Sequence, residues 1–321
     1  MEEGSWPSVA VMGAGAVGCF FGGMLARAGA PVTLIGRPHH IGAITQNGLL
    51  IDSIHFQEHI PVSASTDVAD VRNAEIVLLS VKTPDTEEAA QSLAPYLASG
   101  AIILSLQNGV DNVERIRAAA HTDAVAAVVY VAAEMTAPGC VKHTGRGNLI
   151  IGDLVRSHQS DHARRQTLER VAALFARAGV PCRVSDNIEA ELWTKLIMNC
   201  AYNAISALTR ARYGRLVADP WTHDLMRQIV EEVLAVARAS GVRMPDNDLV
   251  GAAWNLAGTM PAAISSTAQD ITRGKRTEID ALNGYVTRRG AGLRIPTPVN
   301  QTLYVLVKLL EEAPRISARI G

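Results

Sequence analysis

The chain has 321 residues, of which 48% are hydrophobic and 19% charged, so it is long enough for two globular domains and has the composition of a folded protein. Its formal charge of −1, from 30 basic and 31 acidic residues, gives no indication of nucleic-acid binding. No apolar run reaches the roughly 18–20 residues that a membrane span needs, and the acidic, polar start over residues 1–8 is not typical of a secretion signal.

The first half of the chain alternates short apolar runs with segments of helical spacing. We predict buried strands over residues 8–12, 32–35, 76–81, 102–106 and 125–131, a small hairpin from 49–51 and 59–62, and helices over 17–28 and 163–178. This alternation predicts an α/β domain of the Rossmann type, a doubly wound parallel sheet with helices on both faces. Such a sheet binds its ligand at the carboxyl ends of its strands.

The pattern changes near residue 188, after which helical spacing dominates and no convincing strand is found. Helices are expected over 188–208, 221–240, 247–256, 279–289 and 298–310. We therefore expect two domains, a dinucleotide-binding domain over 1–186 and an all-helical substrate and catalytic domain over 187–321. The long apolar helices can pack within one chain or between two, which leaves a homodimer open.

The first predicted strand runs into Gly13-Ala14-Gly15-Ala16-Val17-Gly18, a GxGxxG turn that opens a helix, which is the context the motif requires. Gly13 permits the tight bend, Gly15 lets the backbone approach a pyrophosphate, and Gly18 lets the helix pack closely on the strand. Exposed amides at the helix start then bind the anion. All six residues are candidates for cofactor binding, and the alternative is a glycine-rich turn without a ligand.

The end of the second predicted strand indicates which dinucleotide is bound. An acidic residue there would bind the ribose hydroxyls of NAD, but this chain has Gly36-Arg37 and no carboxylate nearby. Arg37 lies 19 residues after Gly18, and its guanidinium suits a 2′-phosphate through charged, bidentate hydrogen bonds. NADP is therefore favoured over NAD, and the alternative is a solvated surface arginine.

Two further strand ends carry polar residues. Lys82 follows the strand at 76–81, and Gln107-Asn108-Gly109 follows the strand at 102–106. Lys82 is able to attract a carboxylate or phosphate, and Asn108 both donates and accepts, so it suits a nicotinamide or a substrate carbonyl. The alternatives stay open: a solvated edge for Lys82, and a plain turn for Asn108-Gly109.

The second domain opens with a polar stripe. Lys195, Asn199 and Asn203 are spaced i, i+4, i+8, so on a helix they share one face. Their neighbours are apolar, which predicts a largely buried helix. A buried lysine is costly unless it has a partner or a task, and desolvation in general makes a lysine a better proton donor near neutral pH. The alternative is a lysine whose stem packs while its head reaches water.

The segment 265–280 is dense in polar groups and precedes an apolar helix. Ser266 is able to hydrogen-bond a substrate carboxylate, and Glu278 to orient or neutralise Lys195. The other interpretation is a helix start made by Thr277 and Asp280, with Glu278 as a first-turn acid that favours the helix dipole. From these residues alone, the helix start is the favoured interpretation.

These segments together resemble one family, ketopantoate reductase (2-dehydropantoate 2-reductase). They occur in the family's order and span nearly the whole chain, and the segments at 193–203 and 276–280 are the most specific. The shared pieces are the glycine turn at 13–18, Arg37, Lys82, Gln107-Asn108-Gly109, the 193–203 helix, Ser265-Ser266, the 276–280 segment and Asn283-Gly284.

The resemblance implies an NADPH-dependent oxidoreductase that reduces 2-dehydropantoate to pantoate, a step of pantothenate biosynthesis, in a cleft between its two domains. It implies that Lys195 is the general acid and Glu278 an acidic active-site residue. The family's substrate-binding positions match Asn199, Asn203 and Ser266, and its cofactor-side positions match Arg37, Lys82 and Asn108.

The chain departs from the family pattern at Thr267, where methionine is common, at Ala263, where some members have asparagine, and around residues 49–57. These departures leave the exact substrate open, so a reductase of another 2-oxo acid and an opine-type dehydrogenase remain alternatives. A non-catalytic NADP-binding sensor would have no need of Lys195 and Glu278. Four scattered cysteines without metal-like spacing predict reduced thiols, no metal site and a cytoplasmic location.

Overall fold

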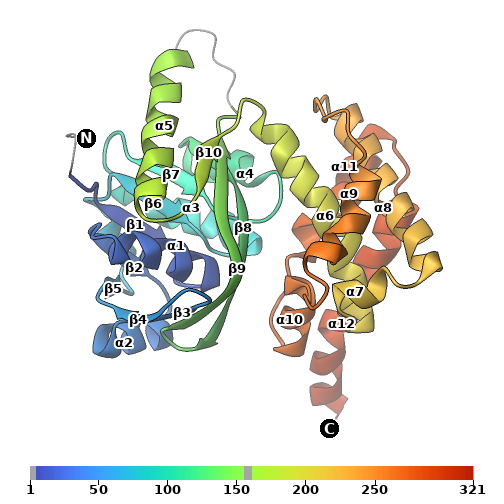
Figure 1. Cartoon of the computed structure of the whole chain (residues 1–321), viewed down its shortest axis with the longest axis horizontal. Helices are drawn as coiled ribbons and strands as arrows, with labels where there is room; N and C mark the ends of the chain where they lie inside the picture. The colour runs from blue at the N-terminus through green and yellow to red at the C-terminus, as the bar shows by residue number, and fades with distance from the viewer. Residues whose placement is uncertain (1–4, 155–160, 321) are drawn as a thin grey trace. The chain divides into compact units, whose positions relative to one another are not determined.

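The computed structural model describes residues 5–154 and 161–320, so the first four residues of the polar amino-terminal start lie outside the described residues. The chain divides into two compact units (Figure 1). Unit 1 comprises Met1–Gln107 and Asp111–Ile188, and unit 2 comprises Asn108–Val110 and Glu189–Gly321. The three-residue segment Asn108–Val110 thus packs with unit 2, although the chain on both sides of it belongs to unit 1.

Unit 1 is built on a ten-stranded sheet in the order β4-β3-β9-β8-β7-β6-β1-β2-β5, with β10 beside β9. Six neighbouring strands of this sheet, in the order β5-β2-β1-β6-β7-β8, are all parallel, which confirms the Rossmann-type arrangement. The expected hairpin is also present, as β3 and β4. The strands are β1 (Val9–Met12), β2 (Val32–Ile35), β3 (Leu49–Ser53), β4 (Gln57–Ile60), β5 (Ser63–Ser65), β6 (Ile76–Leu79), β7 (Ile102–Ser105), β8 (Ala124–Ala137), β9 (Cys140–Gly152) and β10 (Cys182–Val184).

The sheet is mixed rather than wholly parallel, because β8 turns back into the antiparallel β9. The strand predicted at 125–131 is too short, since β8 continues to Ala137. Its second half is half-buried or exposed and lacks the continuous apolar run of a strand that is covered on both faces. Hydrogen bonds to β9 hold the second half of β8 in strand conformation. The sequence of β8 alone does not show that β9 will pair with it.

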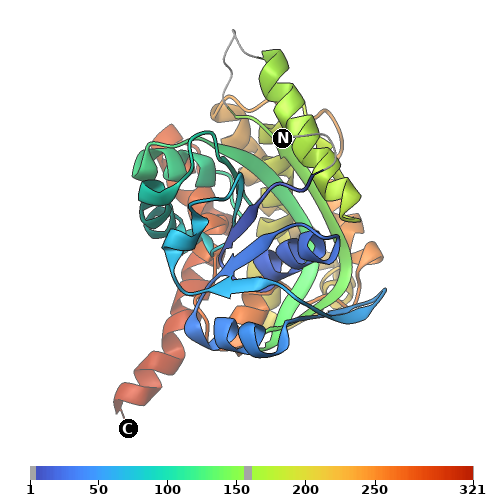
Figure 2. The same cartoon turned by 90° about the vertical axis from the view of Figure 1, so that its left-hand side faces the viewer.

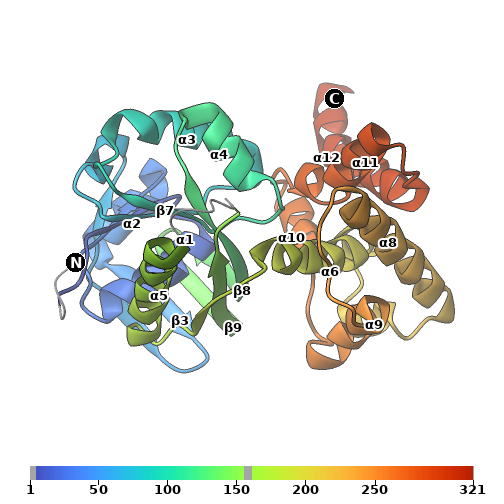
Figure 3. The same ribbon diagram turned by 90° about the horizontal axis from the view of Figure 1, so that it is seen from above.

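Helices cover both faces of the sheet, with α3 and α4 on one face and α1 and α5 on the other (Figure 3). The sheet curls around α1 (Figure 2), which packs against strands from both halves of the sheet. The helices of unit 1 are α1 (Ala16–Arg27), α2 (Pro38–Asn47), α3 (Thr86–Leu93), α4 (Asn112–Ala120) and α5 (Asp161–Arg177), with 3-10 turns η1 (Val68–Val71), η2 (Thr83–Asp85) and η3 (Ala94–Tyr96).

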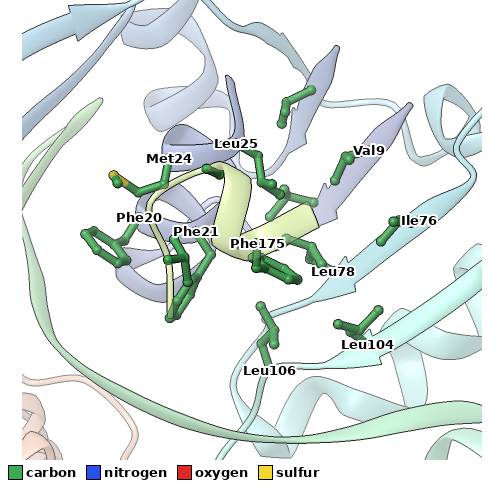
Figure 4. Close-up of a cluster of buried hydrophobic side chains, with 14 of the residues drawn as sticks. Val9, Phe20, Phe21, Met24, Leu25, Ile76, Leu78, Leu104, Leu106 and Phe175 are labelled. Atoms are coloured by element: carbon green, nitrogen blue, oxygen red, sulfur yellow. The ribbon is translucent and has the colours of Figure 1, made fainter. Parts of the chain in front are cut away.

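The core of unit 1 lies between α1, α5 and the strands. Phe20, Phe21 and Leu25 of α1 and Phe175 of α5 pack together above the sheet (Figure 4). Phe21 contacts Phe175 edge to face, with ring centroids 6.4 Å apart. Truncating a buried phenylalanine such as Phe21 to alanine typically costs about 3–5 kcal/mol. This core fixes the start of α1 against β1, where the glycine turn lies.

Over residues 189–320 the structure contains helices joined by loops and no strand, as expected. Its core surrounds α6, whose Ile197, Cys200 and Tyr202 are completely buried. Among residues 5–154 and 161–320, no helix has the length and apolarity to cross a membrane. The helices are α6 (Ile188–Thr209), α7 (Tyr213–Leu216), α8 (Pro220–Ala239), α9 (Leu249–Thr259), α10 (Ser266–Thr272), η4 (Ile279–Ala281), α11 (Asn283–Leu293) and α12 (Pro298–Ile320).

The helix predicted over 279–289 is wrong in one respect, because it is broken into η4 and α11. Leu282 has φ −106° and ψ −109°, which interrupts the helix between them. The side-chain amide of Asn283 donates to Asn300 Oδ1 (2.9 Å) and to the Cys200 carbonyl oxygen (3.4 Å). The break therefore places a buried hydrogen bond against α6, and such a tertiary contact has no local sequence signal.

Candidate active site

The glycine turn between β1 and α1 has the three geometries that the motif predicts. Gly13 has φ +111°, and a Cβ there would lie 2.7 Å from the Val81 amide nitrogen. A Cβ on Gly18 would overlap the Gly13 carbonyl oxygen and the Ser80 hydroxyl. A Cβ on Gly15 would meet no atom within 4 Å. The fold itself therefore requires Gly13 and Gly18, whereas the space beside Gly15 is open to a ligand.

The start of α1 suits an anion. Its N-cap residue is Gly15, no side chain caps it, and its first turn contains no acid. The first amides of a helix have no intrahelical acceptor, and the helix dipole is positive at that end. Ser80 donates to the Gly13 carbonyl oxygen (2.9 Å), which holds the turn in place. Residues 13–18 therefore fit a pyrophosphate group.

Arg37 lies beside this turn, at the end of β2. A Cβ on Gly36 would approach the Ala14 Cβ to 2.6 Å, so the two strand ends nearly touch. Arg37 is exposed and precedes α2, and among the described residues its guanidinium has no hydrogen-bond or ion-pair partner. A free guanidinium next to the turn fits a 2′-phosphate on the ribose that follows the pyrophosphate.

Lys82 follows β6, the strand beside β1, and is half-buried at the start of η2. The backbone on its amino side is fixed by Gln107, whose side chain is 5% exposed. The Gln107 amide nitrogen donates to the Val81 carbonyl oxygen (3.1 Å) and to Thr86 Oγ1 (2.6 Å), and its oxygen accepts from Ser105 (3.0 Å). Gln107 thus ties the ends of β6 and β7 together.

Asn108, the next residue, belongs to unit 2 and contacts Glu278 there. Its side-chain amide donates to Glu278 Oε2 over 2.8 Å, a hydrogen bond between residues 170 positions apart in sequence. Both side chains are half-buried. Glu278 precedes η4 and its side chain caps no helix, so the interpretation of Glu278 as a first-turn helix acid is wrong. The structure brings two of the predicted site residues together here.

The segment that carries Glu278 is anchored by α12. The Thr277 amide donates to Glu311 Oε1 (2.7 Å), and Asp280 accepts from Tyr304 (2.8 Å) and Lys308 (3.0 Å). Burial alone would raise the pKa of Asp280, but the hydrogen bonds from Tyr304 and Lys308 outweigh it and hold that pKa below its ordinary value. Anchors on both sides of Glu278 restrict the directions its carboxylate can take.

The predicted polar stripe lies on α6. Lys195 and Asn199 are half-buried, and most of their neighbours on α6 are buried, so α6 is largely buried as predicted and Lys195 is partly covered. Asn203 is 3% exposed, and among the described residues the side-chain amides of Asn199 and Asn203 have no hydrogen-bond partner. The amide groups on this face of α6 are therefore able to hydrogen-bond a polar ligand.

The two serines of the 265–266 pair have different positions. Ser265 is buried and caps α10: its hydroxyl accepts from the Ala268 amide (3.1 Å) and donates to the Asn203 carbonyl oxygen (3.2 Å). Ser266 is exposed at the first position of α10. Ser265 therefore fastens the start of α10 to the polar stripe and leaves Ser266 available. Thr267, a departure from the family pattern, is buried in the core.

All four cysteines are free, including two that are completely buried. Burial raises the pKa of the Cys19 thiol to about 12 and raises that of Cys200, on α6, further. A neutral thiol is a poor nucleophile. Cys19 and Cys200 are therefore poor candidates for a nucleophile.

Sequence reasoning missed Ser80, Thr86 and Asn112. The Thr86 hydroxyl donates to Asn112 Oδ1 (3.0 Å) and extends the Gln107 network. Ser80 could have been identified from the sequence, because it is a polar residue near the end of an apolar run. Thr86 and Asn112 lie near helix starts, where polar residues are ordinary, so the sequence gives no reason to single them out.

Comparison with known proteins finds relatives over most of the chain. The family model described as ketopantoate reductase PanE/ApbA matches residues 9–156, and the one for the carboxy-terminal part of that family matches 187–311. A 2-dehydropantoate 2-reductase of Pyrococcus abyssi is 32% identical over 93% of this chain and 96% of that protein.

Solved structures show the same fold. A PanE/ApbA family ketopantoate reductase from Ralstonia eutropha JMP134 is 50% identical, with a TM-score of 0.88, and the match covers 96% of this chain and 99% of that one. A D-mandelate dehydrogenase structure with NADH, 23% identical with a TM-score of 0.87, covers 95% of this chain and 99% of that one and shares the fold. The chain is therefore an oxidoreductase that belongs to the ketopantoate reductase (PanE/ApbA) family.

Proposed function

We propose that the protein reduces 2-dehydropantoate to pantoate with NADPH and so serves pantothenate biosynthesis. The observation that carries the proposal is the polar stripe of α6, where two amides without partners lie on the same helix face as Lys195. Neutral amides beside an ammonium group suit a substrate with a hydroxyl group and a ketone. The proposal assigns the cofactor to residues 1–186 and the substrate to residues 187–321.

The cofactor fits the residues that would hold it. The amides at the start of α1 would bind the pyrophosphate, because the space at Gly15 is open and the helix start is uncapped. Arg37 would bind the 2′-phosphate, which distinguishes NADP from NAD, and Lys82 and Asn108 would lie on the nicotinamide side. When bound, the reduced nicotinamide supplies a hydride to the 2-oxo carbon.

The residues of the chain supply the proton and the orientation. As an ammonium group, Lys195 polarises the oxo oxygen and donates the proton that completes the 2-hydroxy acid; solvent then reprotonates the amine. Such a general acid contributes about 100- to 10,000-fold in rate. Glu278 orients Lys195 and balances its charge. Asn199, Asn203 and Ser266 hold the hydroxyl and carboxylate groups of the substrate in a reactive geometry.

The test is NADPH oxidation by the purified protein, followed at 340 nm, with 2-dehydropantoate, pyruvate and 2-oxoisovalerate as separate substrates. NADH is the cofactor control, and parallel reactions with added amines test for an opine-type dehydrogenase. We expect rapid turnover with 2-dehydropantoate and NADPH. Faster turnover with another 2-oxo acid, or turnover that depends on the amine, would contradict the proposed substrate. NADPH binding without turnover of any substrate would favour a sensor.

A further inference from the structure

A buried polar network lies at the carboxyl ends of β6 and β7, entirely within unit 1. Gln107 follows β7, Thr86 is the first residue of α3, and Asn112 is the first residue of α4. Each is 5% exposed or less. Gln107 donates to the Thr86 hydroxyl, which donates in turn to Asn112 Oδ1, and the Gln107 oxygen accepts from Ser105. Both polar atoms of the Gln107 side chain have partners, so its orientation is fixed.

Stability alone gives little reason for a polar network at this place. A buried hydrogen bond contributes little net stability, because its donor and acceptor give up hydrogen bonds to water, and apolar groups of the same shape can replace the pair at almost no cost. What a hydrogen bond supplies, and an apolar contact does not, is a preferred direction. The role of the network therefore depends on which group Gln107 orients.

That group is the carbonyl of Val81. The paired register of β6 and β7 ends at Leu79 and Ser105, so Val81 lies two residues beyond it. The Val81 carbonyl oxygen accepts from the Gln107 side-chain amide over 3.1 Å. The strand ladder does not extend to this carbonyl, and the side chain of Gln107 fixes the direction of the backbone there instead.

The peptide group between Ser80 and Val81 supports the glycine turn. A Cβ on Gly13 would lie 2.7 Å from the Val81 nitrogen and 2.8 Å from the Ser80 carbonyl carbon, so this peptide lies directly against Gly13. The Gly13 carbonyl oxygen accepts from the Ser80 hydroxyl (2.9 Å) and from the Gly15 amide (2.8 Å). A rotation of the 80–81 peptide would therefore displace the turn that leads into α1.

We propose that Gln107, held by Thr86 and Asn112, is a positioning residue for the dinucleotide. Through the 80–81 peptide it keeps the glycine turn in the conformation that binds the pyrophosphate, and this inference rests on the proposed assignment of the cofactor to residues 13–18. The apparent Kd of a ligand rises as the fraction of molecules in the binding conformation falls. Because NADPH and NADH share the pyrophosphate, loss of the network weakens the binding of both.

The test compares Thr86→Val and Gln107→Met with Thr86→Ser and Thr297→Val. Thr86→Val keeps the shape of the side chain and removes the hydroxyl, whereas Thr86→Ser keeps the hydroxyl. Gln107→Met keeps the length of the side chain and removes its amide, and it tests the same role if Thr86→Val does not fold. Thr297→Val is the matched control, because Thr297 is also a buried threonine but belongs to unit 2.

Three measurements separate positioning from stability. Isothermal titration gives the Kd for NADPH and for NADH, and thermal unfolding without cofactor gives the stability of each variant. Hydrogen–deuterium exchange with mass spectrometry reports the local order of residues 13–18 in the cofactor-free protein. The amides of Gly13 and Ala14 are suitable reporters, because both donate to the Ile35 carbonyl oxygen, over 2.9 and 3.1 Å.

In Thr86→Val and Gln107→Met, the Kd values for NADPH and NADH are expected to rise by the same factor, about 3- to 10-fold, which corresponds to the net contribution of one hydrogen bond. The amides of the turn are expected to exchange faster in the same two variants. Thr86→Ser and Thr297→Val are expected to stay within about twofold of the wild-type Kd values and to show wild-type exchange over residues 13–18.

Folded Thr86→Val and Gln107→Met variants that melt at a lower temperature but keep the wild-type Kd for NADPH overturn the inference, because the network would then serve stability alone. A rise for NADPH without a rise for NADH also overturns it, because the effect would then lie at the 2′-phosphate. A wild-type protein that binds neither dinucleotide overturns both the inference and the proposed cofactor site. The Kd values do not depend on turnover, so the test separates this inference from the proposed activity.

Discussion

Substitutions at Gly15 and Gly18 are expected to affect different properties, namely cofactor affinity at Gly15 and stability at Gly18. In Gly15→Ala the new methyl group meets no atom within 4 Å, and φ at that position is −91°, which alanine adopts freely. Replacing glycine by alanine at an N-cap lowers the free energy of unfolding by about 0.5–1 kcal/mol. A similar gain offsets this loss, because alanine makes the unfolded chain less flexible. The melting temperature should therefore change by no more than about 2–4 °C.

The same methyl group lies where the pyrophosphate would approach the backbone. Loss of one charged hydrogen bond there costs about 1.5–3 kcal/mol, so the Kd for NADPH should rise about 10- to 150-fold. In Gly18→Ala the methyl group overlaps a backbone oxygen and the Ser80 hydroxyl. Overpacking of this kind costs about 1–3 kcal/mol, which lowers the melting temperature by about 2–12 °C.

Isothermal titration with NADPH and thermal unfolding without cofactor measure the two effects separately. Gly15→Ala is expected to lose affinity for NADPH and keep its stability, whereas Gly18→Ala is expected to lose stability. A folded Gly15→Ala variant with wild-type affinity would refute the placement of the pyrophosphate at this turn. A Gly18→Ala variant as stable as the wild type would refute the close contact between α1 and β1.

Three further predictions follow from the site. Lys195→Ala should lower kcat about 100- to 10,000-fold and leave the Kd for NADPH nearly unchanged, and a wild-type kcat would remove Lys195 from the mechanism. Arg37→Gln should raise KM for NADPH about 10- to 150-fold and leave KM for NADH within about threefold; equal changes for both cofactors would show that Arg37 does not bind the 2′-phosphate. Because the pKa of Asp280 is lowered in the folded state, its ionised form adds stability above the ordinary pKa of 3.8 and loses it as pH falls below that value. The melting temperatures of the wild type and Asp280→Asn should therefore converge as pH falls from 6 to below about 3, and a constant difference would contradict this role.

The sequence predicts the parts of the fold that have local signals. The buried strands of the parallel region, the hairpin of β3 and β4, and the long helices of unit 2 are confirmed because each has an apolar periodicity of its own. The strand β9 was missed because Gly145 and Gly147 break its apolar pattern, although the hydrogen bonds of β8 hold it in place.

The candidate site was predictable in its residues more than in its contacts. The GxGxxG spacing and the stripe on α6 can be read along the chain, because both depend on neighbouring turns of one element. The hydrogen bond from Asn108 to Glu278 joins residues 170 positions apart, and the anchoring of Asp280 by α12 depends on tertiary packing. Such contacts depend on the packing of the whole fold, so no local pattern in the sequence predicts them.

The short segment Asn108–Val110 sets a condition on how this protein can be recombined with its relatives. The chain enters unit 2 for three residues after β7, returns to unit 1, and enters unit 2 again at Glu189. A chimera that exchanges everything after residue 188 would leave behind the donor to Glu278 and the packing of Val110 in the helical core. The helical unit is therefore inherited as two pieces of sequence, and an exchange that preserves it must include residues 108–110.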